Sequence, residues 1–156
     1  MRRKLKAKKE LTSDRVYNSV KVAKFINYIM LDGEKNIARK IVYNAFDLIK
    51  NKEKGNDPLV IFEGALKNAG PTMEVRSRRV GGANYQIPRE VRENRRLALS
   101  MRWIIGAAKA KKGQAMYKKL AEELMLANKN EGEAVRKKEN VHKMADANKA
   151  FAHFSW

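Results

Sequence analysis

Apolar residues recur every three or four positions along most of this chain, and that spacing is interrupted only once. The helical period gives each segment one apolar stripe, and such stripes bury themselves by packing against one another. Between about 73 and 88 the spacing becomes strand-like on both sides of Gly81-Gly82. The sequence therefore predicts a mostly α protein, a compact bundle of about six helices with one protruding β-hairpin between the third and fourth.

Local signals mark where these helices begin and end. Asp57 is a good N-cap with Pro58 in the first turn, and Gly70-Pro71 is a good stop for the same helix. Val16 and Val20 are expected to begin the apolar stripe of the first helix. The first predicted helix runs from about Asp14 to Met30. The second begins at about Asn36, with Ile37, Ile41, Ala45 and Leu48 as its apolar stripe, flanked by Val42 and Ile49. The third runs from Asp57 to Ala69 and the fourth from about Arg89 to Lys109. The fifth carries Met116, Leu120 and Leu124, and the sixth carries Val141, Met144, Ala145, Asn148 and Phe151.

The predicted hairpin has an unusual composition for a core element. Its first strand runs from Met73 to Val80, Gly81-Gly82-Ala83-Asn84 is the turn, and Tyr85 to Ile87 is the return strand, closed by Pro88. The first strand carries Arg76, Arg78 and Arg79, and the alternation of a strand sends them to both faces. Unpaired guanidinium groups on both faces cannot be buried, so the hairpin is expected to project from the body. Tyr85 is available either to stack on a base or to brace the turn.

The net charge is the strongest compositional signal. There are 35 Lys and Arg against 17 Asp and Glu, which gives a formal net charge of +18. Such a surface attracts polyanions. Six of the first nine residues are Lys or Arg, so residues 1–12 are expected to form a flexible basic arm. The rest of the chain, residues 13–156, is expected to form a single helical RNA-binding domain.

The fourth predicted helix concentrates this charge on one face. Between Asn94 and Ala121 there are eight Lys or Arg and no acid. Arg95, Arg102 and Lys109 are spaced by seven and form a cationic stripe opposite the apolar one. Surface helices usually pair such cations with Glu at i, i+4, and no such partner is present here. A nucleic-acid backbone is expected to supply the missing anions.

Other chemistries find little support in the residues. Cys is absent and only two His occur, so no metal set is expected, and His142 is expected to pair with Asp146 on a helix face. Gly81-Gly82 lacks the following Lys-Ser/Thr of a phosphate loop. No apolar stretch approaches the length of a membrane span. We therefore expect no enzyme activity, cofactor, small-molecule substrate or membrane partner. A free architectural protein that coats DNA or RNA remains the alternative.

At the hairpin, the stretch from Glu74 to Pro88 closely resembles the signature of the bacterial small-subunit ribosomal protein seven family. Residues 25–33 and 142–153 agree with two further blocks of that family, and the resemblance covers essentially the whole chain. It implies a helical body in the head of the 30S ribosomal subunit, in the cytoplasm. It further implies primary binding to the 3′ major domain of 16S rRNA, nucleation of head folding, and a hairpin near the exit-site tRNA and the mRNA path. Small-subunit proteins nine, eleven and nineteen are the implied neighbours.

The cationic pattern and the resemblance together predict the binding residues. The rRNA-binding set is Arg2, Arg3, Lys4, Lys6, Lys8, Lys9, Lys35, Arg76, Arg78, Arg79, Arg92, Arg95, Arg96, Arg102, Lys109, Lys111 and Lys112, and the hairpin turn near tRNA and mRNA is Gly81, Gly82, Ala83, Asn84 and Tyr85.

Overall fold

The computed structural model describes residues 11–53 and 55–154, which form helices and one antiparallel hairpin. In chain order the elements are α1 (Val20–Ile29), α2 (Lys35–Lys52), α3 (Pro58–Ala69), β1 (Met73–Val80), β2 (Ala83–Glu90), α4 (Glu93–Ala110), α5 (Met116–Asn128), α6 (Glu133–Ala147) and a 3-10 helix, η1 (Lys149–Phe154). The predicted mostly α class is confirmed, as is the hairpin between the third and fourth helices. The predicted basic arm falls largely on residues 1–10, outside the described part of the chain.

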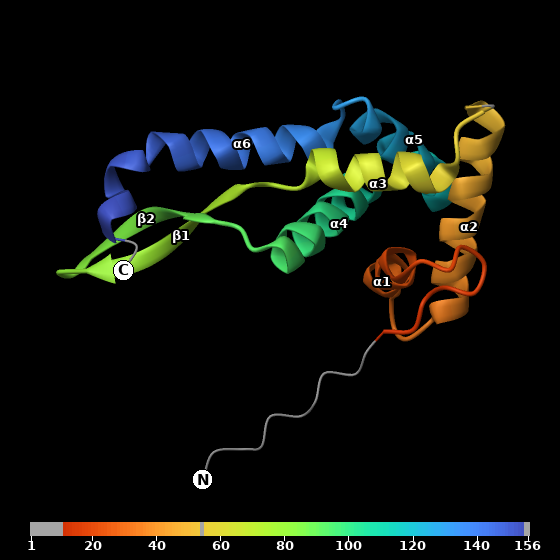
Figure 1. Cartoon of the computed structure of the whole chain (residues 1–156), viewed down its shortest axis with the longest axis horizontal. Helices are drawn as coiled ribbons and strands as arrows, with labels where there is room; N and C mark the ends of the chain where they lie inside the picture. Colours follow the sequence, from red (N-terminus) through yellow and green to blue (C-terminus); the bar gives the residue numbers. More distant parts are fainter. Residues whose placement is uncertain (1–10, 54, 155–156) are drawn as a thin grey trace, which may run out of the picture.

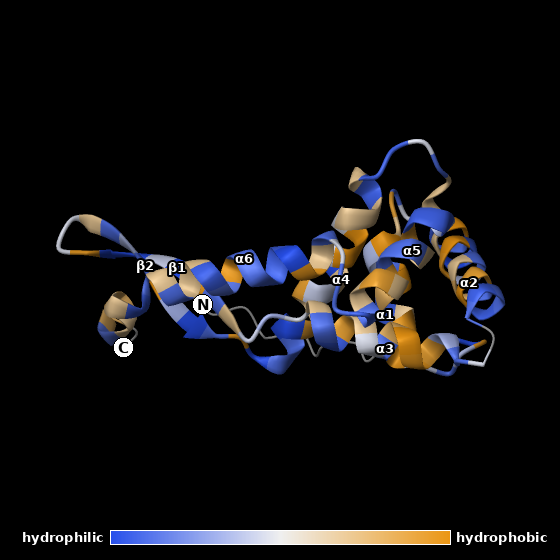
Figure 2. Cartoon of the chain, turned by 90° about the horizontal axis from the view of Figure 1, so that it is seen from above, coloured by the Kyte–Doolittle hydropathy of each residue, from blue (hydrophilic) through white to orange (hydrophobic). Residues whose placement is uncertain are grey.

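The hydrophobic core lies among the helices at one end of the molecule. Phe25, Phe46 and Phe62 are fully buried, and the Phe62 ring centroid lies 5.1 Å from that of Phe25 and 5.5 Å from that of Phe46. These contacts join α1, α2 and α3. Figure 2 shows hydrophobic residues gathered in α1, α2, α3 and α5, whereas α6 and the hairpin are more hydrophilic.

The first helix begins later than predicted. Residues 15–17 form a turn, α1 starts at Val20, and Val16 and Val20 are 65% and 52% exposed. Asp14 is only 7% exposed, and its Oδ2 accepts hydrogen bonds from the amides of Val16 and Tyr17. The carboxylate therefore holds a turn where apolar spacing alone had suggested a helix.

The apolar stripe of α2 is rotated by about one residue from the predicted one. Ile37 is 56% exposed, while Ala38 is 2% exposed and Val42 and Ile49 are fully buried. Periodicity gives the same spacing for either choice, and only packing against α1 and α5 decides which face is buried. In α3 the prediction is confirmed, because Asp57 Oδ1 accepts the amide of Leu59 at 3.0 Å.

The hairpin extends away from the core, and α6 runs beside it (Figure 1). The turn contains only Gly81 and Gly82, with φ of 56° and 91°, as in the tight turns that suit a two-residue hairpin. Ala83 and Asn84 were predicted in the turn but belong to β2, where Asn84 pairs with Arg79. Since β2 continues to Glu90, α4 starts at Glu93 and not near Arg89 as predicted.

The C-terminal segment covers one side of the hairpin. The sixth helix was predicted to reach Phe151, but α6 ends at Ala147 and η1 follows. The ring of Tyr85 on β2 contacts those of Phe151 and Phe154, each with centroids 5.3 Å apart. His142 does not pair with Asp146. Its Nε2 instead accepts the amide of Thr72 at 3.0 Å, which fixes α6 to the residue before β1.

Candidate nucleic-acid interface

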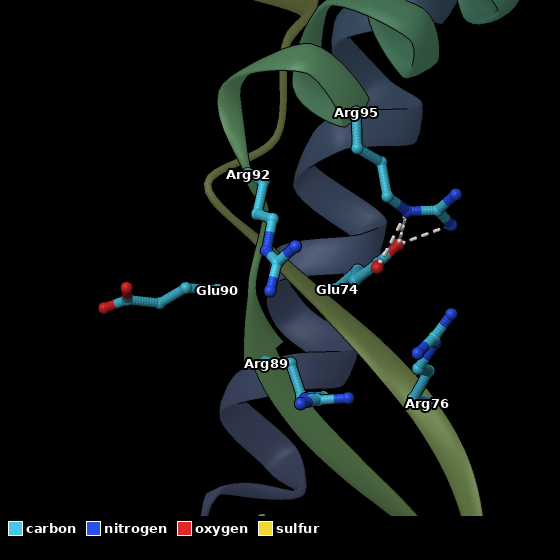
Figure 3. Close-up of a pocket in the computed structure, with 6 residues that line it drawn as sticks. All are labelled: Glu74, Arg76, Arg89, Glu90, Arg92 and Arg95. Carbon is cyan, nitrogen blue, oxygen red and sulfur yellow. Dashed lines mark hydrogen bonds and ion pairs between the residues drawn. The ribbon is translucent and has the colours of Figure 1, made fainter. Parts of the chain in front are cut away.

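A hollow of about 330 Å³ lies where the base of the hairpin meets the start of α4. It is lined by Glu74, Arg76, Arg89, Glu90, Arg92 and Arg95, and we call it the arginine hollow. Figure 3 shows the four guanidinium groups grouped around Glu74, while the carboxylate of Glu90 points away from them. All four arginines are exposed. The excess of positive charge makes the hollow suited to anions.

Local folding explains why these residues meet. In the register of the hairpin, Glu74 on β1 lies opposite Arg89 on β2. The amide of Val91 donates to the carbonyl of Thr72 at 2.9 Å and so extends the pairing beyond the ladder. Arg92 then becomes the N-cap residue of α4, and Arg95 follows within the first turn. Two strands and a helix N-terminus thus deliver their side chains to one place.

The principal ion pair of the hollow joins Glu74 and Arg95. Arg95 Nε donates to both carboxylate oxygens at 2.8 Å, and its Nη2 lies 2.7 Å from Oε2. The hydrogen bond and the negative charge of Glu74 raise the pKa of Arg95 above its ordinary value. The expectation that the α4 cations have no acidic partner is therefore wrong for Arg95. Its partner is 21 residues away and comes from another element, so a search at i, i+4 missed it.

Farther along α4, the predicted cationic face is present. Arg102 and Lys109 are exposed and lie along the border of the face that buries Met101, Ile104 and Ile105, and not directly opposite it as predicted. The Arg102 guanidinium carbon lies 5.5 Å from the centroid of the Tyr28 ring on α1. This cation–π contact orients the arginine without removing its charge.

Two other residues of this region that were predicted to bind RNA, Arg96 and Lys111, interact with groups of the protein itself. Arg96 is half-buried, and its Nε donates to the carbonyl of Gly70 at 3.3 Å, at the end of α3. Lys111 Nζ lies 3.1 Å from Oε2 of the fully buried Glu123 and 3.9 Å from Glu122. Here too the absence of acidic partners was a wrong expectation. Lys111 and Arg96 both help to hold the body together.

The arginines of the hairpin differ in their surroundings. Arg76 and Arg79 are exposed, whereas Arg78 is half-buried and its Nη1 donates to the carbonyl of Phe154 at 3.0 Å. Tyr85 was predicted either to stack on a base or to brace the turn, and its ring contacts Phe151 and Phe154 of η1, which braces the hairpin. Gly81, Gly82, Ala83 and Asn84 form the exposed tip.

The remaining predicted residues are spread more widely. Lys35 is exposed at the first position of α2, and Lys112 is exposed just after α4. Arg2, Arg3, Lys4, Lys6, Lys8 and Lys9 lie outside the described residues. Sequence reasoning missed Arg89 because that residue was assigned to the start of a helix. The strand spacing of Ile87 and Arg89 beyond Pro88 was the signal available.

The described residues contain neither a metal-binding cluster nor a membrane-spanning helix. Within 11–53 and 55–154, no group of three or more His, Asp or Glu side chains is arranged to hold a metal ion. None of the helices in this described part is long and apolar enough to cross a membrane.

Comparison with known proteins decides the family. The family described as ribosomal protein S7p/S5e matches residues 1–149. The chain belongs to this family. Members are structural ribosomal proteins that bind RNA in translation, and they are not enzymes.

Individual relatives match this chain over all or nearly all of their length. The small ribosomal subunit protein uS7 of Thermotoga neapolitana is 56% identical over 156 residues, and that of Thermotoga maritima is 54% identical over 156 residues, with complete coverage of both chains in each case. The protein of the same name from Caldanaerobacter subterraneus is 56% identical over 149 residues, which cover 96% of this chain and 95% of the relative. The family resemblance seen at the hairpin is thereby confirmed.

Proposed function

We propose that this protein is a structural constituent of the small ribosomal subunit that binds 16S rRNA and nucleates folding of its 3′ major domain. The observation that carries the proposal is the arginine hollow, where four exposed guanidinium groups meet at the junction of hairpin and body. Phosphate groups are the anions that such a surface takes in a ribonucleoprotein. The names of the full-length relatives, small ribosomal subunit protein uS7, support the same partner.

The shape supports contact with a folded RNA and not with a short linear segment. The hairpin extends away from the body (Figure 1). The cations of α4 continue from Arg95 in the hollow to Arg102, which contacts Tyr28 of α1. Cations on separate elements can each bind a different RNA segment. We place the exposed tip from Gly81 to Asn84 near the exit-site tRNA and the mRNA path, and the basic arm on the rRNA.

The assembly follows from the same proposal. In the 30S subunit the protein lies in the head, beside small-subunit proteins nine, eleven and nineteen. Binding first to the 3′ major domain, it brings RNA helices together through cations on different elements, which is how a small basic body can organise a much larger RNA.

A competition experiment tests this function against the alternative of a free nucleic-acid coating protein. The full-length protein is titrated into labelled 3′ major domain RNA at physiological salt, with random duplex DNA as competitor. The proposal expects the RNA to be bound at least about a thousandfold more tightly than the DNA, the lower end of the range by which specific binding exceeds non-specific binding. Equal affinities would support the coating protein instead.

Chemical probing of the same RNA is a second test of the proposed function. On addition of the protein, nucleotides distributed over several helices of the 3′ major domain should become protected together. Protection confined to one short segment would contradict a role in organising the domain.

A further inference from the structure

Glu74 is a carboxylate at the centre of a surface that we propose binds the phosphates of RNA. Its side chain is 15% exposed, while that of Arg95 is 49% exposed. By charge alone, an acid in this place opposes the binding of anions. Its position beneath the arginines therefore calls for a structural explanation.

The hydrogen bonds of Glu74 leave one edge of Arg95 available. A guanidinium has five N–H donors, and the carboxylate engages the Nε donor and one donor of Nη2. The two donors of Nη1 and the second of Nη2 remain. The planar fork of an arginine binds carboxylates and phosphates in the same two-bond manner. Arg95 can thus bond Glu74 with one edge and a phosphate with the other.

The surroundings of Arg95 favour this second partner. Arg89 and Arg92 extend from β2 and the start of α4 toward the middle of the hollow, and Arg76 extends from β1 toward Arg95 (Figure 3). Four like charges this close together repel one another and would spread into solvent. The carboxylate of Glu74, which lies among them, offsets part of the repulsion and fixes the Arg95 side chain in place.

We propose that Glu74 is a positioning residue for phosphodiester binding, which holds Arg95 with its outward edge ready for a backbone phosphate of the RNA. Arg76, Arg89 and Arg92 complete the site around the same phosphate or its neighbour. This inference rests on the proposed rRNA-binding function and names the group that one part of the interface recognises.

Two single variants, Glu74→Gln and Glu90→Gln, test this positioning role. Both residues line the hollow, and both changes raise the net charge by one, but only Glu74 bonds an arginine there. Affinity for the 3′ major domain RNA is measured for each full-length variant. Glu74→Gln is expected to bind about fivefold to tenfold more weakly, the size typical of one lost charge-assisted contact, while Glu90→Gln binds as tightly as wild type or more tightly. Equal or tighter binding by Glu74→Gln would overturn the proposal.

The variant Arg95→Lys is an independent test of the positioning role, because Arg95 is exposed and its replacement does not threaten folding. It keeps the charge but loses the fork, so a similar loss of affinity is expected. In the Arg95→Lys background, Glu74→Gln should have little further effect, because the two residues act as one unit. Wild-type affinity of Arg95→Lys, or losses that simply add, would contradict the positioning role.

The outcomes separate this inference from the function on which it rests. Circular dichroism of each variant establishes that it is folded, and if Glu74→Gln is not, Arg95→Lys carries the test alone. A wild-type protein that fails to bind the RNA contradicts the proposed function itself. Wild-type binding that is insensitive to both Glu74→Gln and Arg95→Lys contradicts only the role of Glu74.

Discussion

The ring of Tyr85 on β2 lies 5.3 Å, centroid to centroid, from the ring of Phe151 on η1. The Tyr85 ring also contacts Phe154, whose carbonyl accepts a hydrogen bond from Arg78 on the opposite strand. Arg78 and Tyr85 are paired across the hairpin, so the C-terminal 3-10 helix contacts both strands at the same cross-strand pair. The hairpin is thus held along part of its length while its tip stays exposed.

Removing this contact should loosen the hairpin more than the body. Phe151→Ala deletes a half-buried ring and its aromatic pair, at an expected cost of about 1–2 kcal/mol. Because the core helices do not depend on that ring, the effect should be local. Amide hydrogen exchange should speed up in β1 and β2 and stay unchanged in α2 and α3. Lys149→Ala, at an exposed position of the same 3-10 helix, is the control, and equal exchange in the two variants would contradict the bracing role.

The hairpin turn makes a second prediction. Apart from the adjacent residues of the chain, no atom of residues 11–53 and 55–154 lies within 4 Å of a Cβ placed at Gly81 or Gly82, so backbone conformation limits substitution there. The φ of 56° at Gly81 is one that Asn tolerates, whereas a branched side chain is strained at the φ of 91° at Gly82. Gly81→Asn should therefore leave the NMR shifts of the hairpin unchanged, and Gly82→Val should destabilise the hairpin by about 1–2 kcal/mol. A Gly82→Val variant with wild-type hairpin shifts would show that the turn does not require glycine.

A third prediction concerns Glu123, in the helical body. Its carboxylate is fully buried, accepts the amide of Ala134 at 3.0 Å and lies 3.1 Å from Lys111 Nζ, so it caps α6 and pairs with the end of α4. Glu123→Ala leaves these partners unsatisfied and should lower the free energy of unfolding by about 3 kcal/mol. The adjacent Glu122, 38% exposed, is the matched control and should cost under about 0.5 kcal/mol when changed to Ala. Denaturant titration measures both, and similar losses would contradict the account.

The pH dependence of stability tests Asp14. Burial alone would raise the pKa of Asp14, but hydrogen bonds from the Tyr43 hydroxyl and two amides outweigh it and lower the pKa below the ordinary 3.8. The contribution to stability is therefore present above pH 3.8 and lost as the pH falls through the folded-state pKa. Burial and the same hydrogen bond raise the pKa of Tyr43 to about 12, so its contribution is present below pH 10 and lost as the pH rises toward 12.

Tyr43→Phe should remove the contribution of the Tyr43 hydroxyl and weaken that of Asp14, which keeps its two amide hydrogen bonds. The acid-unfolding midpoint should move to higher pH, because Asp14 keeps less of its lowered pKa without the hydroxyl. Acid titrations of wild type and variant followed by circular dichroism measure this shift. An unchanged midpoint would mean that the Tyr43 hydrogen bond does not contribute to the stability of the native state.

Sequence reasoning succeeded where the signal was local. The Asp57-Pro58 start of α3 depends on neighbouring residues alone and is confirmed. The turn predicted from Gly81 to Asn84 is confirmed at its two glycines, while Ala83 and Asn84 belong to β2. Val16 shows the limit, because its apolar spacing fits a helix but the Asp14 carboxylate makes a turn there. Ile37 was predicted on the apolar stripe of α2 but is exposed, while the neighbouring Ala38 is buried, because only tertiary packing selects the buried face.

For the interface, composition identified the cations but not their partners. Glu74 and Arg95, or Thr72 and His142, are far apart in the chain and meet only when the hairpin lies against α4 and α6. The arginines of α4 therefore divide into exposed ones, such as Arg102, and ones that also hold the fold, such as Arg96. No periodicity in one helix separates these two groups.

The salt dependence of rRNA binding tests the central claim most directly. If about five to ten phosphates are neutralised, log K for the full-length protein and the 3′ major domain RNA should fall with log salt at a slope of roughly −4 to −9. The double variant Arg92→Ala/Arg95→Ala should remain folded, since both side chains are exposed, and its slope should be shallower by roughly 1 for each arginine removed. A wild-type slope near zero, or a variant slope equal to wild type, would contradict phosphate binding in the arginine hollow.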